Sequence, residues 1–268
     1  ILNFVKPDKI VLQKATDFEA NFEFRPLEPG YGVTIGNALR RVLLNSLEGY
    51  AIVGINIVGA DHEFATIKGV TEDVTELILN LKQVRIKKKV EHDINVEKIT
   101  LSIKNKTEFT AGMIGEASPS FEVMNPELLI CTMDTSAKLD IEISIGKGRG
   151  YVPAEDHKDK SSHFGYIPVD AIYTPIKNVR YTIENTRVEQ RTDFEKLIME
   201  VHTDGTIHPE EAVKQASRIL IQHLMIITDE NITFDTKEDK KEDLVDEQTL
   251  QLRKMLKTPL EDLDLSVR

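Results

Sequence analysis

The amino-acid sequence predicts an α+β fold with two domains, one of them inserted into the other. The chain has 268 residues, which is long for one domain and short for three. Its 40% hydrophobic and 29% charged residues are typical of a globular protein. Both ends of the sequence combine alternating strands with a long helix, whereas the middle holds a series of short strands. We therefore expect a discontinuous first domain, an antiparallel sheet with two main helices, from residues 1–49 and 175–230. Residues 50–174 then form an inserted, strand-rich second domain.

The first domain begins with a predicted β-hairpin. Residues 9–16 and 21–28 each alternate apolar with polar side chains, which is the period of a half-buried antiparallel strand. Glycines end the second strand, and apolar residues at helical spacing predict a helix over 35–47. The same arrangement of strands followed by a helix recurs later in the chain, with two strands expected within 178–203. A helix over 209–228 follows, with proline at its start and two glutamates in its first turn.

The inserted domain is predicted mainly from short apolar or alternating runs. Two strands are expected within 51–67, and then a helix with apolar positions from Val74 and an N-cap at Thr71. The polar, glycine-rich residues 146–175 predict a long, partly mobile loop. Residues 231–268 predict an acidic linker with at most one short marginal helix. Three further strands are expected over 84–90, 97–103 and 138–145.

Charge and cysteine content exclude several classes of protein. A formal net charge of -11 argues against a chain that mainly wraps nucleic acid, because such a chain needs a basic face. The single cysteine, Cys131, cannot form a disulfide within the chain, and no apolar run is long enough to cross a membrane. The opening residues lack the basic start and the apolar stretch of a signal peptide, so we expect a cytoplasmic protein.

The glycine-rich segments do not match a nucleotide-binding loop. Gly30, Gly32 and Gly36 have GxGxxxG spacing after an alternating strand, so we interpret them as turn glycines. The segment GKGRG at 146–150 has no GK[ST] and opens no helix. The histidines lie far apart, without HExxH or CxxC, so no metal, cofactor or catalytic site is expected. Two alternative functions are a small-molecule enzyme that uses these glycine segments and a direct DNA-binding module.

The two main helices predict contacts with other polypeptides. In the first helix, Arg40, Arg41 and Leu44 lie about 120° to 160° from the centre of the apolar stripe. A leucine between two arginines is suited to anchor a partner, although an incidental leucine with two solvated cations is an equal alternative. The second helix adds Ile221 and Met225 opposite an already wide apolar face. Such a helix needs burial all round, which favours self-association over a fully internal position.

Five segments of the sequence are distinctive: RPLEPGYGVTIGNALRRVLLNSLEGYA, GVTEDVTELILNLK, GRGYVPAE, TRVEQRTDFEKLIMEVHTDGTIHPEEAV and TPLEDLDLSVR. They span nearly the whole chain in order and resemble the alpha subunit of bacterial DNA-directed RNA polymerase. The resemblance implies that residues 1–49 and 175–230 form a dimerisation domain and that residues 50–174 contact the large subunits. Residues 231–268 then lead toward a missing C-terminal domain, the only part expected to bind DNA.

The resemblance also implies a function and a set of contact residues. It describes a non-catalytic, homodimeric scaffold without a cofactor that nucleates polymerase assembly by binding beta and then beta-prime. Omega and sigma join in the full complex, in the cytoplasm at the nucleoid and away from any membrane. Thr34, Arg41 and Leu44 match beta-contact positions, and Lys82 matches a beta-prime contact. Within the matched segments, Pro29 and Val33 replace residues expected to be basic or polar, which leaves Arg41 in place. The expected dimer-interface residues on the two helices are Ile35, Leu39, Leu43, Leu220, Ile221, Leu224 and Met225.

Overall fold

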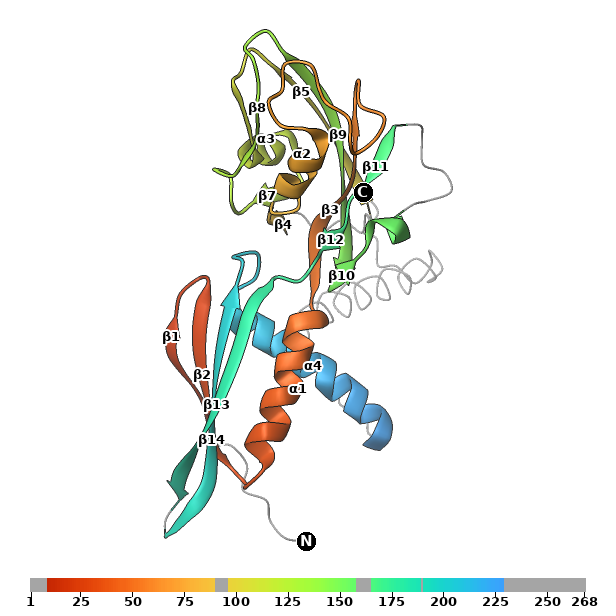
Figure 1. Cartoon of the computed structure of the whole chain (residues 1–268). Helices are drawn as coiled ribbons and strands as arrows, with labels where there is room; N and C mark the ends of the chain where they lie inside the picture. The colour runs from red at the N-terminus through yellow and green to blue at the C-terminus, as the bar shows by residue number, and fades with distance from the viewer. Residues whose placement is uncertain (1–8, 90–95, 158–164, 189, 229–268) are drawn as a thin grey trace, which may run out of the picture. The chain divides into compact units, whose positions relative to one another are not determined.

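A computed structural model of the chain describes residues 9–89, 96–157, 165–188 and 190–228 (Figure 1). The expected acidic linker at 231–268 lies outside the described residues. Residues 1–221 form one compact unit and residues 222–268 a second, of which the end of helix α4 (Pro209–Thr228) is described. No helix in the described ranges is both long and apolar enough to cross a bilayer.

Both ends of the described chain contribute to a four-stranded antiparallel sheet. Its strands are β1 (Lys9–Ala15), β2 (Glu19–Leu27), β13 (Ile176–Val188) and β14 (Arg191–Thr203), in the order β1-β2-β14-β13. The predicted hairpin and the two predicted later strands are therefore confirmed. Alternate residues of β2 and β14 point to one face of the sheet, where they are buried: Phe22, Phe24, Leu197, Met199 and Val201.

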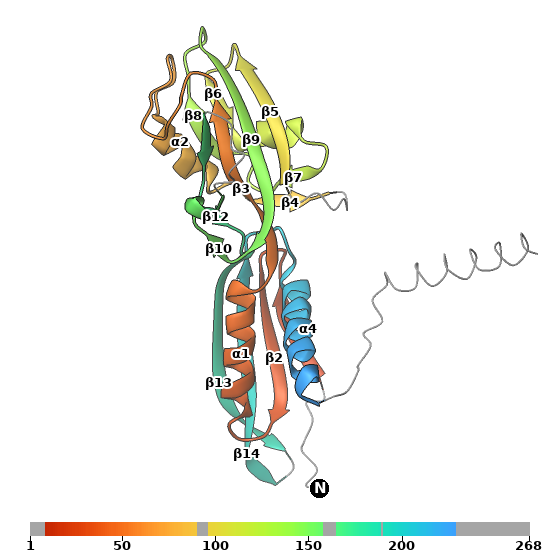
Figure 2. The same ribbon diagram turned by 90° about the vertical axis from the view of Figure 1, so that its right-hand side faces the viewer.

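Helices α1 (Tyr31–Asn45) and α4 cover this face of the sheet (Figure 2). The sheet and the two helices share one hydrophobic core, which also takes in Leu47 just after α1. The predicted helix over 209–228 is confirmed, and its first half supplies small buried side chains to this core. The helical contributors are Leu39, Leu43, Ala212, Val213 and Ala216.

Helix α1 begins at Tyr31 and ends at Asn45, whereas the sequence pattern placed it over 35–47. The difference arises because Gly32 and Gly36 lie inside the helix and not in the turn before it. A Cβ atom at Gly32 would lie 2.7 Å from Glu195 Oε2, and one at Gly36 would lie 2.8 Å from the Tyr181 ring. Glycine at these positions thus lets α1 approach β13 and β14 closely.

A second, six-stranded antiparallel sheet is built from the middle of the chain. Five strands run in the order β5-β9-β3-β4-β7, and β11 (Tyr166–Pro168) also pairs with β3. A separate pair consists of β6 (Glu108–Thr110) and β8 (Leu129–Thr132), and two short helices are α2 (Val74–Leu81) and α3 (Ala111–Ala117). One face of the large sheet packs with α2 and α3 around a second core. The five ordered strands are β3 (Glu48–Ile57), β4 (Ile86–Lys88), β5 (Val96–Lys104), β7 (Phe121–Val123) and β9 (Lys138–Arg149).

Two local expectations for this region are wrong. Residues 62–67 form a loop and not a strand, because this segment accepts a hydrogen bond from the start of α2: Val74 N–H donates to Ala65 O. The N-cap of α2 is Asp73 and not Thr71, since the Asp73 carboxylate accepts from Glu76 N–H at 2.7 Å.

The expected long loop at 146–175 is largely ordered in its described parts. Strand β9 continues to Arg149, followed by β10 (Tyr151–Val152) and the short helix η1 (Ala154–His157). Strand β10 pairs with β12 (Ala171–Ile172), and Tyr173 packs across the large sheet in a third apolar cluster. A Cβ atom at Gly148 would lie 2.5 Å from the Tyr173 ring, so glycine at this position allows close packing.

The two large cores draw on different parts of the chain. The larger core uses buried residues from 52 to 169, and the smaller uses residues from 20 to 47 and from 176 to 216. The domain boundaries expected at 49/50 and 174/175 stay a prediction, which this separation of the cores supports.

We predict that Gly49→Ala lowers the free energy of unfolding by about 3 kcal/mol or more. The new Cβ would lie 1.9 Å from the Tyr173 carbonyl oxygen, so the backbone where the chain leaves and re-enters the smaller core has to move. Urea unfolding measures the change. Gly115→Ala in α3 is the matched control, because its Cβ would make an ordinary contact at 3.4 Å. Equal stability of the two variants would contradict the prediction.

Candidate functional site

The solvent-facing side of α1 carries the residues expected to contact a beta subunit. Arg41 is exposed and makes no hydrogen bond or ion pair with any residue that the structure describes. Arg40 is also exposed, but its Nε donates to Val179 O at 3.2 Å. Thr34 is exposed and its hydroxyl donates to Gly30 O at 3.2 Å. Leu44 is half-buried against the core, so it contributes less exposed apolar surface than the helical wheel predicts.

The amino end of α1 is occupied by a carboxylate of its own chain. Gly30 N–H donates to Glu195 Oε1 and Gly32 N–H to Glu195 Oε2, both at 2.8 Å. Helix N-termini attract anions because their first N–H groups lack helical partners. Here Glu195 supplies that negative charge. The glycine segment at 30–36 therefore has a structural role, which argues against a nucleotide phosphate in this place.

The expected dimer-interface residues divide into two groups. Leu39 and Leu43 are buried in the core of the single chain, so the structure gives no support to their contact with a second copy. The side chains of Ile35, Leu220, Ile221 and Met225 are half-buried, and that of Leu224 is 57% exposed. Beyond the expected set, Ile226 and Ile227 near the end of α4 are each 78% exposed.

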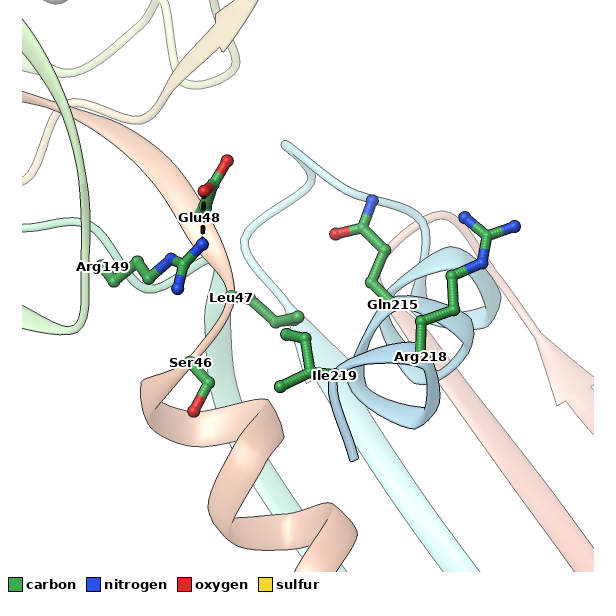
Figure 3. A pocket seen from close by; sticks show the side chains of 7 residues that line it. All are labelled: Ser46, Leu47, Glu48, Arg149, Gln215, Arg218 and Ile219. Atoms are coloured by element: carbon green, nitrogen blue, oxygen red, sulfur yellow. Dashed lines mark hydrogen bonds and ion pairs between the residues drawn. The ribbon is translucent and has the colours of Figure 1, made fainter. Parts of the chain in front are cut away.

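A pocket of about 220 Å³ lies between the end of α1 and the middle of α4 (Figure 3). Leu47 and Ile219 face one another across it. On one side Glu48 accepts from Lys147 and Arg149, each at 2.7 Å. These two contacts, that of Lys147 first, lower the pKa of Glu48 below its ordinary value. The pocket residues are Ser46, Leu47, Glu48, Arg149, Gln215, Arg218 and Ile219.

The cations of the GKGRG segment at 146–150 are thus neutralised within the chain, since both pair with Glu48. Burial raises the pKa of the Cys131 thiol to about 12, with a smaller contribution from Glu72. A thiol in that state is a poor nucleophile at neutral pH. In the described ranges, no group of three or more His, Cys, Asp and Glu side chains could hold a metal ion.

Lys82 lies at the carboxyl end of α2 and is held by an ion pair. Its Nζ lies 2.7 Å from Asp170 Oδ2, and Asp170 Oδ1 accepts from Ala154 N–H at 2.9 Å. Both contacts, that of Lys82 first, lower the pKa of Asp170 below its ordinary value. Asp170 therefore joins the end of α2 to the segment that opens η1.

Comparison with known proteins decides the family. Residues 53–174 match the model of the RNA polymerase Rpb3/RpoA insert domain. The chain is 59% identical to DNA-directed RNA polymerase subunit alpha of Cytophaga hutchinsonii, 54% to that of Flavobacterium psychrophilum and 53% to that of Bacteroides thetaiotaomicron. Each match covers 100% of this chain and 81% of the relative. The chain belongs to the family of RNA polymerase alpha subunits. The resemblance and the α+β fold class are thereby confirmed.

Family membership gives the chain a role in RNA polymerase and argues against an independent small-molecule enzyme. Sequence reasoning for this alpha-family chain missed two residues, Glu195 and Asp170. Glu195 acts on a glycine 163 positions away, and the only sequence signal is the lack of a capping side chain before α1. Asp170 stands in an apolar segment between β11 and β12, and no local pattern indicates its pairing with Lys82.

We predict that Asp170→Asn lowers the free energy of unfolding by about 1 kcal/mol at pH 7, because it removes the charged acceptor for Lys82. The folded-state pKa of Asp170 lies below its ordinary value of 3.8. The stabilisation is therefore complete above that value and is lost as the pH falls through the lower folded-state pKa. Urea unfolding from pH 7 to pH 3 should show the two proteins converging only below about pH 4. Asp61→Asn at an exposed position is the control, and a pH-independent difference for Asp170→Asn would contradict the assignment.

Proposed function

We propose that the chain is the homodimeric assembly scaffold of a bacterial RNA polymerase, which recruits beta and then beta-prime and supplies no catalytic residue. The observation that carries the proposal is the uncovered apolar end of α4. Leu224, Ile226 and Ile227 expose 57%, 78% and 78% of their surface. Large apolar side chains gathered on one exposed helix segment mark a surface that another polypeptide covers.

We assign a second copy of the chain to this surface, because the exposed residues continue the helix whose first half packs with α1 on the shared core. In a two-fold dimer the same patch serves both copies, so the half-buried and exposed residues of both helices meet their counterparts. Ile35, Leu220, Ile221, Leu224 and Met225 are the residues we assign to it. Leu39 and Leu43 support the helix from within the single chain. An obligate interface of this kind buries on the order of 2,000 Å² or more.

The contacts with the large subunits are assigned to two surfaces. The exposed guanidinium of Arg41, with Thr34 and the half-buried Leu44, contacts beta. Lys82, which an ion pair with Asp170 holds in place, contacts beta-prime. Omega and sigma complete the assembly at the nucleoid in the cytoplasm, and the acidic balance of this chain leaves DNA contact to other parts of the complex.

Leu224→Asp should convert the dimer to monomer. The side chain is exposed in the single chain, so the substitution leaves the monomer core intact but places an unpaired carboxylate in the interface at a cost of several kcal/mol. Sedimentation at micromolar concentration should give twice the monomer mass for the unmodified chain and the monomer mass for the variant. Gln222→Asp adds the same charge at an exposed polar position of α4 and is the control. A monomeric unmodified chain would exclude the dimer.

Arg41→Ala should weaken beta binding at least ten-fold while leaving the fold and the dimer unchanged. The exposed side chain fills no cavity, whereas a guanidinium that clamps a partner contributes roughly 2 kcal/mol or more. Leu44→Ala should act in the same direction but more weakly, with some loss of stability because Leu44 packs on the core. Pull-down of the beta subunit by each dimer, with thermal melting in parallel, measures both effects. Arg180→Ala, which removes an exposed arginine of β13 outside α1, is the matched control, and unchanged beta binding by Arg41→Ala would defeat the assignment.

A further inference from the structure

Helix α1 lacks a capping side chain of its own. Its N-cap is Gly30, with φ of 87°, and no acidic residue lies in its first turn. Glu195, a residue of strand β14, caps the helix instead. We call Glu195 together with the N–H groups of Gly30 and Gly32 the Glu195 clamp. A carboxylate that accepts two N–H groups at 2.8 Å fixes both distance and direction.

The sheet is adapted to form this contact. The pairing of β14 with β2 shifts register between Glu195 and Leu197. Such an irregularity in a strand re-aims the side chain beside it. On the helix side, a Cβ atom at residue 32 would lie 2.7 Å from Glu195 Oε2, so only glycine leaves room for the carboxylate.

The apolar contacts of α1 do not fix its position in the same way. Leu39 and Leu43 are buried and hold the carboxyl half of α1 on the sheet, and the buried Leu47 follows just after the helix. Hydrophobic burial is non-directional, so it tolerates a small slide or rotation of the helix. Directional contacts that the structure describes for α1 include the Glu195 clamp at one end and the bond from Arg40 Nε to Val179 O further along.

We infer that Glu195 is a positioning residue for the beta-binding surface, because it sets where α1 presents Thr34 and Arg41. This inference rests on the proposed function, since it takes that face of α1 as the beta contact. Glu195 itself contacts the amino end of the helix. Its removal therefore loosens the placement of Arg41, about nine residues and 14 Å along the helix from Gly32, while the buried leucines keep the helix folded.

Chemical rescue separates positioning from general stability. Glu195→Ala removes a CH₂–COO⁻ fragment whose shape matches acetate, and it leaves the N–H groups of Gly30 and Gly32 free to bind an anion. We expect Glu195→Ala to bind the beta subunit at least five-fold more weakly than the unmodified dimer. Sodium acetate at about 50 mM, compared with sodium chloride at equal ionic strength, should restore most of the binding and raise the melting temperature of this variant alone.

Two variants serve as controls. Glu184→Ala removes a carboxylate of β13 that pairs with Lys196 at 2.6 Å and does not cap α1, so acetate should have no specific effect on it. Glu195→Gln keeps the volume of the side chain and fills the site, so it should show partial loss without rescue. If Glu195→Ala fails to fold, beta binding by Glu195→Gln still tests the inference.

Each outcome has a separate meaning. Normal beta binding by Glu195→Ala, alongside impaired binding by Arg41→Ala, overturns the inference. Impaired binding by Glu195→Ala without rescue by acetate also overturns it, because the role of Glu195 is then general stability. Normal binding by Arg41→Ala defeats the proposed beta contact instead, and in that case the effect of acetate on melting still decides whether Glu195 holds α1.

Discussion

The close approach of α1 to strands β13 and β14 is the constraint on which the smaller core depends. Gly32 and Gly36 remove the side chains that would hold the helix off the sheet. At this short distance Leu39 and Leu43 reach the buried face, and the opposite side of α1 is left to solvent. The same geometry therefore determines which residues stabilise the fold and which can meet a partner.

Much of the fold follows from local patterns in the sequence. The β1–β2 hairpin, strand β9 and helix α4 have clear periods of two or 3.6 residues. Each forms in the predicted region, although β9 continues to Arg149, beyond the predicted end at 145. The start of α1 does not follow, because it depends on Glu195, which is distant in sequence. The close packing of Gly148 does not follow either, because it depends on Tyr173 from a later strand connection. Elements of 3 or 4 residues, such as β7 and β8, are too short to show a period.

The candidate site was predictable to a smaller degree. A helical wheel identifies the outward side of Arg41 because it needs only the spacing along one helix. It fails to separate Leu39 and Leu43, which the single chain buries, from Leu224, which it exposes, because all three are apolar and only tertiary packing distinguishes them. The pairing of Lys82 with Asp170 is likewise a tertiary contact.

The chain passes between its two large cores twice, after Leu47 and before Ile176. These passages touch, since Gly49 lies against the carbonyl of Tyr173. The ends of the segment that forms the larger core are therefore neighbours in space, as the ends of an inserted domain must be. A change in the length of that segment would therefore leave unchanged the gap that the smaller core has to close, so such a change would not by itself disturb the packing of α1 on its sheet.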